Sequence, residues 1–263
     1  MTEAQEKFGR LMEIVDELRQ KCPWDMKQTK ESIRHLSIEE VYELSDTILQ
    51  NDYPEMRNEL GDLLMHTIFY ASMARDEGEF DMAAVLQEQI EKLIRRHPHV
   101  YGDMVGATEE EINANWEKIK ALERKMKGEE RKSALDGVPQ SLPSLIKAHR
   151  MQEKAANLGF DWEHEDQVWA KVQEEVGEFL AAETPEHQEE EMGDLLFALV
   201  NYCRFKKINP EDALAKASEK FRYRFGYIED KALETHRKLE DMTLEQMEAY
   251  WQEAKRAKKA EQN

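Results

Sequence analysis

One acidic pattern occurs twice in this chain, and it restricts the possible folds more than any other feature of the sequence. Residues 59–65 read ELGDLLM, and residues 191–197 read EMGDLLF. An EExxE motif precedes each of them, at 39–43 and at 174–178. Because the two motifs stand in the same order in both halves, the pattern indicates two copies of one structural plan.

The residues that follow the acidic motifs match as well. KLIRR at 92–96 corresponds to KFRYR at 220–224, and WEKIK at 116–120 corresponds to WQEAK at 251–255. The separation between the second glutamate of EExxE and the tryptophan is the same in both halves. A duplication explains this agreement, with length differences confined to loops between elements.

The composition predicts that each copy is a bundle of helices. Only 11 Gly and 7 Pro interrupt 263 residues, charged residues make up 35%, and no segment alternates apolar and polar residues as a half-buried strand would. We expect an all-α protein with a first domain at 1–128, a linker at 129–141 and a second domain at 142–263. Helices are expected over residues 3–20, 37–50, 54–77, 80–95, 108–127, 142–157, 165–182, 185–207, 209–235 and 243–260.

The acidic charge balance limits the possible partners. A formal net charge of −19 repels nucleic-acid phosphates, so binding of DNA or RNA is not expected, whereas a metal ion can connect the protein to a small phosphorylated ligand. Two distant cysteines fit a reduced environment. The N-terminal segment lacks a signal-peptide core, and no apolar run reaches the roughly 20 residues of a membrane helix. We expect a cytoplasmic protein with no membrane partner.

Helical spacing gathers the acidic residues of each copy. Residues three and four apart share a helix face, so Glu40 and Glu43 lie on one arc, and Glu59 and Asp62 lie on another. Two such helices facing each other bring four carboxylates together, and these repel unless protons or a cation neutralise them. Ligand sets made only of oxygen favour Mg²⁺ or Mn²⁺. The motifs therefore predict a divalent metal site in each copy.

Each acidic helix also carries an interior glycine, Gly61 in the first copy and Gly193 in the second. Glycine inside a helix costs about 1 kcal/mol relative to alanine. We expect a close contact between helices, or the approach of a ligand, to compensate for this cost.

Two other interpretations of the acids are weaker. An isolated EExxE motif is often only a solvated helix face, but the repetition of both motifs argues against that interpretation. A di-iron bundle needs Glu-x-x-His motifs, and none of the eight histidines lies three residues after a glutamate.

On these motifs, and on the segments CPWDMKQT, RRHPHVYGD and NLGFDW, the chain resembles the MazG family of nucleoside triphosphate pyrophosphohydrolases over nearly all of its length. The resemblance implies tandem helical bundles that intertwine in a homodimer. It also implies Mg²⁺-dependent hydrolysis of NTPs and dNTPs to nucleoside monophosphate and pyrophosphate, mainly in the C-terminal copy. Phosphoryl chemistry of this kind needs positioning and charge stabilisation, not a nucleophilic side chain.

The resemblance implies roles for individual residues. The metal ligands would be Glu175, Glu178, Glu191 and Asp194 in the second copy, and Glu40, Glu43, Glu59 and Asp62 in the first. The catalytic residues would be Glu175 together with Glu174 and Glu39, the last two as candidates to orient or deprotonate the attacking water. Nucleotide binding is expected at Lys171, Glu190, Lys220, Arg222, Arg224, Trp251 and Lys255.

One difference between the copies favours the second as the main active site. Lys171 stands four residues before Glu175, on the same helix face and within reach of a phosphate. Leu36 takes the corresponding place before Glu40 in the first copy.

Several residues keep two interpretations. The indole of Trp251 either stacks on a nucleobase, which would allow many substrates, or belongs to the core. Trp24 and Trp162 either pack loops against the bundle or form the wall of a base pocket. His97 and His99 are expected in a loop, bonded to the backbone or to a neighbouring subunit, with a metal-binding or catalytic role as the weaker interpretation.

Two functions other than hydrolysis remain open at this point. The chain could be a non-catalytic helical module that uses its acids and a metal to sense a nucleotide or to bind a regulatory protein. It could also be a purely structural helical protein. Release of pyrophosphate with and without Mg²⁺ separates both from an enzyme.

Overall fold

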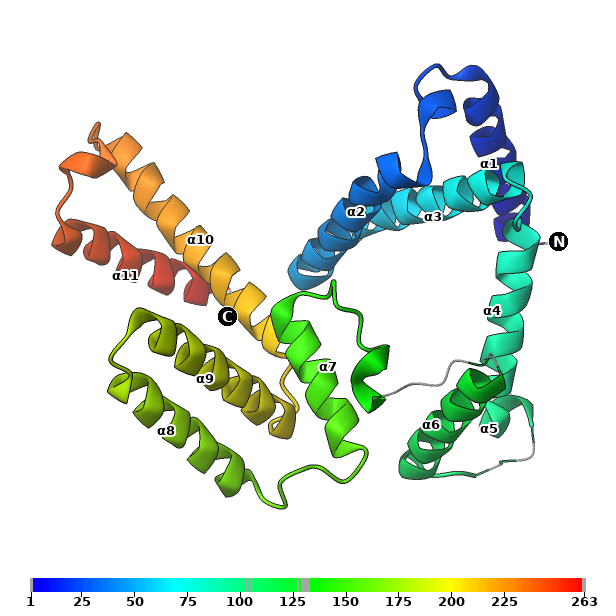
Figure 1. Cartoon of the computed structure of the whole chain (residues 1–263). Coiled ribbons are helices and arrows are strands. Elements are labelled where there is room, and N and C mark those ends of the chain that lie inside the picture. The colour runs from blue at the N-terminus through cyan, green and yellow to red at the C-terminus, as the bar shows by residue number, and fades with distance from the viewer. Residues whose placement is uncertain (1, 103, 105, 127, 129–132, 262–263) are drawn as a thin grey trace. The chain divides into compact units, whose positions relative to one another are not determined.

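The computed structural model describes residues 2–102, 104, 106–126, 128 and 133–261 (Figure 1). Every regular element in these residues is an α-helix or a short 3₁₀ turn, so the predicted all-α class is confirmed. None of the described helices is both long enough and apolar enough to cross a membrane.

The chain divides into two compact units, residues 1–130 and residues 131–263. The predicted linker at 129–141 lies partly outside the described residues, and its described part contains a 3₁₀ turn at Ala134–Gly137, named η2. The boundaries of the two predicted domains therefore stay a prediction.

In the first unit, helix α3 is central because α1, α2 and α4 all pack against it. The buried core is apolar, and its burial stabilises the unit by roughly 25 cal/mol per Å² of surface removed from water. The core residues are Val15, Ile33, Ile68, Phe69, Ala71, Met73 and Met82. The elements of this unit are α1 (Glu3–Lys21), η1 (Asp25–Lys27), α2 (Lys30–Gln50), α3 (Tyr53–Asp76), α4 (Met82–Arg96), α5 (Pro98–Tyr101) and α6 (Glu109–Met126).

In the second unit, two antiparallel helix pairs can be followed in Figure 1, α8 with α9 and α10 with α11. Helix α7 contacts both α9 and α10 and so connects the pairs. Ile228, Ala232 and Met242 form a small core between α10 and α11. After η2, the elements are α7 (Ser144–Ala156), α8 (Glu165–Ala181), α9 (Pro185–Phe205), α10 (Pro210–Glu234), η3 (Leu239–Asp241) and α11 (Leu244–Glu261).

Three predicted helix starts are confirmed by their caps. The side chains of Asp52, Thr184 and Asn209 each accept a hydrogen bond from a backbone N–H in the first turn of α3, α9 and α10. Each of these helices has a proline in its first turn, where a missing N–H has no cost. These starts were readable because a capping side chain and a proline are local signals.

Helix α2 begins earlier than predicted, at Lys30 and not at residue 37. The Thr29 hydroxyl accepts from the backbone N–H of Ser32, and the Ser32 hydroxyl accepts from the backbone N–H of Thr29. This reciprocal cap starts the helix about two and a half turns before the first EExxE motif.

The loop expected around His97 contains a short helix, α5, that was not predicted. Pro98 occupies its first turn, where proline is tolerated. His97 Nδ1 lies 2.6 Å from the backbone oxygen of Leu93, which confirms the expected bond to the backbone. Its ring also meets the Trp116 ring edge-on, so the histidine serves packing in this unit.

Candidate functional site

The second unit brings three glutamates together between α8 and α9. Glu175 and Glu178 are one helical turn apart on α8, and Glu191 lies on α9, which packs along α8. One oxygen of each carboxylate lies within 4.8 Å of an oxygen of the other two. The pairing of two helices with acidic faces therefore creates the cluster.

Glu175 is the buried member of this cluster, with 5% of its surface exposed. Its Oε1 atom lies 2.8 Å from Lys171 Nζ, and its Oε2 atom has no hydrogen-bond partner among the described residues. Lys171 also contacts Glu174 at 2.5 Å, and the hydrogen bonds to Glu174 and Glu175 raise the pKa of this lysine. A buried carboxylate oxygen without a donor is costly unless a cation or a donor reaches it.

The charge of the cluster is only partly compensated. Burial, followed by the neighbouring carboxylates of Glu175 and Glu191, raises the pKa of Glu178. His187 Nε2, on a half-exposed side chain one turn before Glu191 on α9, lies 2.9 Å from Glu191 Oε1. The cluster therefore holds its negative charge at a cost, which a bound cation would remove.

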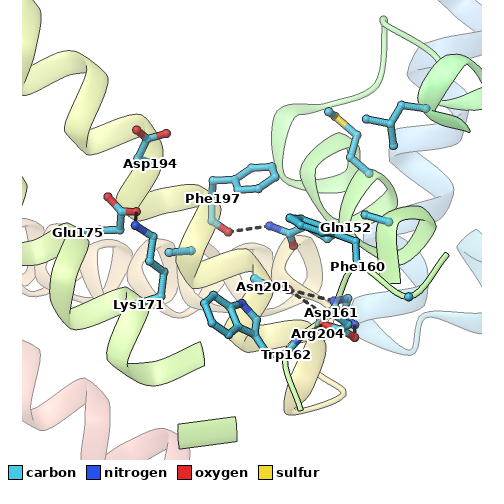
Figure 2. A pocket seen from close by; sticks show the side chains of 15 residues that line it. Gln152, Phe160, Asp161, Trp162, Lys171, Glu175, Asp194, Phe197, Asn201 and Arg204 are labelled. Atoms are coloured by element: carbon cyan, nitrogen blue, oxygen red, sulfur yellow. Dashed lines mark hydrogen bonds and ion pairs between the residues drawn. The ribbon is translucent and has the colours of Figure 1, made fainter. Parts of the chain in front are cut away.

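A cavity of about 640 Å³ lies beside the cluster (Figure 2). Lys171, Glu175 and Asp194 line one end of it, and Figure 2 shows Gln152, Asn201 and the rings of Phe160, Trp162 and Phe197 farther along. Its volume is in the range of small-molecule sites. Its lining consists of Leu135, Met151, Gln152, Ala155, Gly159, Phe160, Asp161, Trp162, Lys171, Glu175, Asp194, Phe197, Ala198, Asn201 and Arg204.

About half of this lining was not predicted from the sequence. Gln152, Asn201 and Arg204 belong to no acidic or basic motif, and only the segment NLGFDW, which includes Asp161 and Trp162, pointed to this region. The structure gathers them because α7, α9 and the loop before α8 converge here.

The first unit repeats the acid cluster with Glu40 and Glu43 on α2 and Glu59 on α3. Glu59 is 6% exposed, and its Oε2 atom has no hydrogen-bond partner among the described residues. Desolvation, and then the neighbouring carboxylates including Asp62, raise the pKa of all three glutamates.

The structure brings together three of the four predicted metal ligands in each unit. Asp62 and Asp194 lie outside the three-carboxylate groups, although Asp194 lines the cavity with Glu175. The predicted catalytic residues Glu39 and Glu174 are exposed beside the clusters, as is Glu190.

The predicted nucleotide-binding residues of α10 and α11 are not part of the cavity. Arg222 pairs with Glu219 at 2.6 Å, and the Arg224 guanidinium lies 5.1 Å from the centre of the Trp251 ring. Of the predicted nucleotide-binding residues, only Lys171 lines the cavity. Those outside it are Glu190, Lys220, Arg222, Arg224, Trp251 and Lys255.

The expectation of a close helix contact at the two glycines is wrong within the chain. A Cβ atom added to Gly61 or to Gly193 would meet no described heavy atom within 4 Å, beyond the local backbone. Both positions face open space. The other expected compensation, the approach of a ligand, stays a prediction.

Two positions that line the cavity in the second unit carry larger side chains in the first unit. Counted from the aspartate of the ExxD motif, Asn201 and Ala198 correspond to Phe69 and His66. Phe69 is 4% exposed and His66 is 7% exposed, so both are buried. Larger side chains therefore occupy the corresponding space of the first unit.

The basic cluster of the first unit is bound to its own glutamate. Glu123 on α6 contacts Arg95 at 2.7 Å and Arg96 at 2.6 Å, and these arginines lower the pKa of Glu123. Counted from the tryptophan, the corresponding residue of the second unit is Lys258, whose ammonium lies over the Tyr223 ring.

The residues of both clusters fit a hard divalent cation. Each cluster offers carboxylate oxygens only, and in each a buried oxygen, Glu59 Oε2 or Glu175 Oε2, lacks a donor among the described residues. Mg²⁺ prefers oxygen ligands and keeps several water molecules, so three carboxylates suffice to hold it.

Comparison with known families supports the assignment of both halves to one plan. The model of the MazG nucleotide pyrophosphohydrolase domain matches residues 28–101 and residues 164–226. The matched segments contain both acid clusters, and each begins near the start of the first acidic helix.

Three curated proteins are similar to the chain over nearly all of its length. The nucleoside triphosphate pyrophosphohydrolase/pyrophosphatase MazG of Thermotoga maritima is 41% identical, over 97% of this chain and 98% of its own. The nucleoside triphosphate pyrophosphohydrolase of Escherichia coli K12 is 43% identical, over 95% of this chain and 97% of its own. YabN of Bacillus subtilis is 46% identical over 95% of this chain, which corresponds to 52% of YabN.

Proposed function

Because this chain belongs to the MazG nucleotide pyrophosphohydrolase family, we propose that it hydrolyses nucleoside triphosphates to nucleoside monophosphate and pyrophosphate. The observation that carries the proposal is the cluster of Glu175, Glu178 and Glu191 at one end of a cavity of nucleotide size. Both NTPs and dNTPs are proposed substrates. The relatives from Thermotoga maritima and Escherichia coli are named for this reaction.

Within the proposed site, the acids have two roles. Glu175, Glu178, Glu191 and Asp194 would hold Mg²⁺, with Mn²⁺ as the other candidate, and such an ion supplies positive charge that stabilises the leaving pyrophosphate. Glu174 is exposed beside the cluster and would orient the attacking water and accept its proton. Lys171, held by Glu174 and Glu175, would turn its ammonium toward a phosphate.

We propose that the second unit carries the main activity. The first unit has Leu36 in place of Lys171 and the buried Phe69 in place of Asn201. Its arginines are already paired with Glu123. The first unit would still hold a cation with Glu40, Glu43, Glu59 and Asp62, and Glu39 takes the place of Glu174. These units correspond to the domains proposed at 1–128 and 142–263.

We also propose that the protein is a homodimer. The chain exposes 19338 Å², whereas two separate compact proteins of half its mass would together expose roughly 14,000 Å². Large apolar side chains on the acidic helices contribute to this excess, among them Val41, Leu60 and Leu180, each more than half exposed. A second copy would cover these faces and compensate for their contact with water.

The proposed dimer also offers a way for the residues of α10 and α11 to reach the nucleotide. Lys220, Arg222, Arg224, Trp251 and Lys255 lie outside the cavity in one chain, as does Glu190 on α9. A triphosphate that extends out of the cavity, or a second copy, would bring these residues to the ligand.

Sedimentation equilibrium is expected to give twice the mass of the chain. Leu180→Glu, which places a charge on an apolar side chain that is 76% exposed, is expected to shift the protein toward the monomer because burial of an unpaired charge is costly. A wild-type monomer at micromolar concentration would contradict the proposed dimer.

Pyrophosphate release from a panel of NTPs and dNTPs tests the proposed function. We expect turnover with Mg²⁺, no turnover with EDTA, and recovery when excess Mg²⁺ is added back. Tight, metal-dependent nucleotide binding without turnover would instead identify a non-catalytic sensing module. Neither binding nor turnover would leave only a structural role.

A further inference from the structure

The cavity beside Glu175 contains two amide side chains with fixed orientations, and we propose that Gln152 and Asn201 together bind the hydrogen-bonding edge of a nucleobase. The inference rests on the proposed nucleotide hydrolysis. It identifies which part of the nucleotide the cavity recognises, and it makes Gln152 a residue that contacts the base.

The orientation of Gln152 follows from its one hydrogen bond. Its Nε2 atom donates to the backbone oxygen of Phe197 at 2.8 Å (Figure 2). Because a carbonyl oxygen only accepts, the amide nitrogen must face Phe197, and Oε1 is left as a free acceptor. Gln152 is 7% exposed, and Oε1 has no partner among the described residues. A buried acceptor in this state favours a ligand that brings a donor.

The orientation of the Asn201 amide is fixed by Arg204, which donates to its oxygen. Its Oδ1 atom accepts from Arg204 Nε at 3.0 Å and from Arg204 Nη2 at 2.9 Å. Arg204 is in turn held by Asp161, with 2.9 Å between Nη1 and Oδ2. The Nδ2 atom of Asn201 is therefore left as a donor, and no described residue accepts from it. Asp161 and Arg204 act as positioning residues for this amide.

An acceptor and a donor in one cavity match a feature that all natural bases share. Each base carries a donor beside an acceptor on its Watson–Crick edge: N6–H and N1 in adenine, N4–H and N3 in cytosine, N1–H and O6 in guanine, N3–H and O4 in uracil or thymine. Guanine and uracil present the donor and the acceptor in the reverse order from adenine and cytosine, so the two kinds of base would meet the two fixed amides in flipped orientations. The contact thus allows a broad range of nucleotides while it excludes triphosphates that lack a base.

Aromatic side chains provide the flat surfaces of the same cavity. Trp162 and Phe197 line it, as does Phe160, which is 85% exposed on the loop between α7 and α8. Stacking on such rings is tolerant of base identity. Gln152 Oε1 is itself covered, and Phe160 is the most exposed of these three rings, so we infer that Phe160 moves aside for a base. The proposed base site is at Trp162, which lines the cavity, and not at Trp251, which does not.

Substrate analogues test the contact in the wild-type protein. Purine riboside triphosphate keeps the N1 acceptor of ATP but lacks the N6 donor, so we expect its kcat/KM to be roughly tenfold lower, mainly through KM. Inosine triphosphate keeps a donor at N1 beside O6 and is expected to match GTP. Equal kcat/KM for ATP and purine riboside triphosphate would overturn the proposal.

A variant then assigns the effect to one side chain. Gln152→Met keeps the length of the side chain and removes its polar atoms, so ATP is expected to lose roughly tenfold in kcat/KM while purine riboside triphosphate is unchanged. Gln188→Met is the matched control, because Gln188 Nε2 also donates to a backbone oxygen, that of Ala182 at 3.1 Å, but lies outside the cavity. Equal losses for both substrates in Gln152→Met would show a structural role and contradict the proposal.

Measurements of nucleotide binding distinguish a failure of the proposed base site from a failure of the proposed hydrolysis. Calorimetric titration with AMP and with purine riboside monophosphate reports the same contact without turnover. A protein that hydrolyses no triphosphate but prefers AMP would refute hydrolysis and retain the base site. A protein that hydrolyses NTPs but binds both monophosphates equally would retain hydrolysis and refute the base site.

Discussion

Glu175→Gln is expected to lower the rate of NTP hydrolysis by more than about a hundredfold. Removal of a residue that only supports a metal ligand costs up to about a hundredfold, and removal of the ligand itself is expected to cost more. Glu175 is the buried carboxylate of the cavity, and its Oε2 atom lacks a donor among the described residues. The amide of glutamine keeps the shape of the side chain but removes the charge that a divalent cation needs. Steady-state pyrophosphate release measures the effect.

Glu40→Gln is the matched control, because Glu40 is the corresponding residue of the first unit. It is expected to retain most of the activity, since Leu36 stands in the place of Lys171 and the buried Phe69 stands in the place of Asn201. Thermal unfolding should show that both variants are folded, because each relieves repulsion among carboxylates. Equal losses in the two variants would argue against a main site in the second unit.

Without a divalent cation, the wild-type protein is expected to lose stability relative to the double variant Glu59→Gln, Glu178→Gln as the pH rises from about 5 to about 7.5. Burial and neighbouring carboxylates raise the pKa of both glutamates above the ordinary value of 4.5. The folded protein then binds more protons than the unfolded chain above pH 4.5, so its stability falls as the pH rises through the raised pKa values. Urea unfolding at the two pH values measures the difference.

Other groups do not change the sign of this comparison. The lowered pKa of Glu123 or of Asp16 acts below the ordinary carboxyl range, where stability is lost as the pH falls. Burial lowers the pKa of His66, which adds stability as the pH rises near 6.5, but this contribution is common to wild type and variant.

Mg²⁺ is expected to remove the pH effect in the wild type. A cation that binds only the folded protein adds about 2.7 kcal/mol at a concentration one hundred times its Kd, and it binds best when the carboxylates are ionised. The gain in stability should therefore be larger at pH 7.5 than at pH 5, and smaller in the double variant. A wild-type protein that Mg²⁺ does not stabilise at pH 7.5 would contradict the proposed metal sites.

Local features of the sequence were sufficient for the helical elements and for the acid clusters. Asp52, Thr184 and Asn209 mark helix starts by side chains that act within one turn, and the spacing of three residues places Glu175 and Glu178 on one face. The reciprocal cap of Thr29 and Ser32 was equally local but was overlooked, and α2 was predicted to start too late.

A duplicated all-α chain with two pairs of acidic helices was predictable from the sequence, because these features depend on neighbours within a few residues. Only the tertiary structure decided that Gln152, Phe197 and Asn201 share one cavity with Glu175, and that Glu123 already occupies the arginines of the first unit. It also decided that Gly61 and Gly193 face open space. Such contacts join residues from different helices, and their distances depend on how the helices pack, which no local pattern encodes.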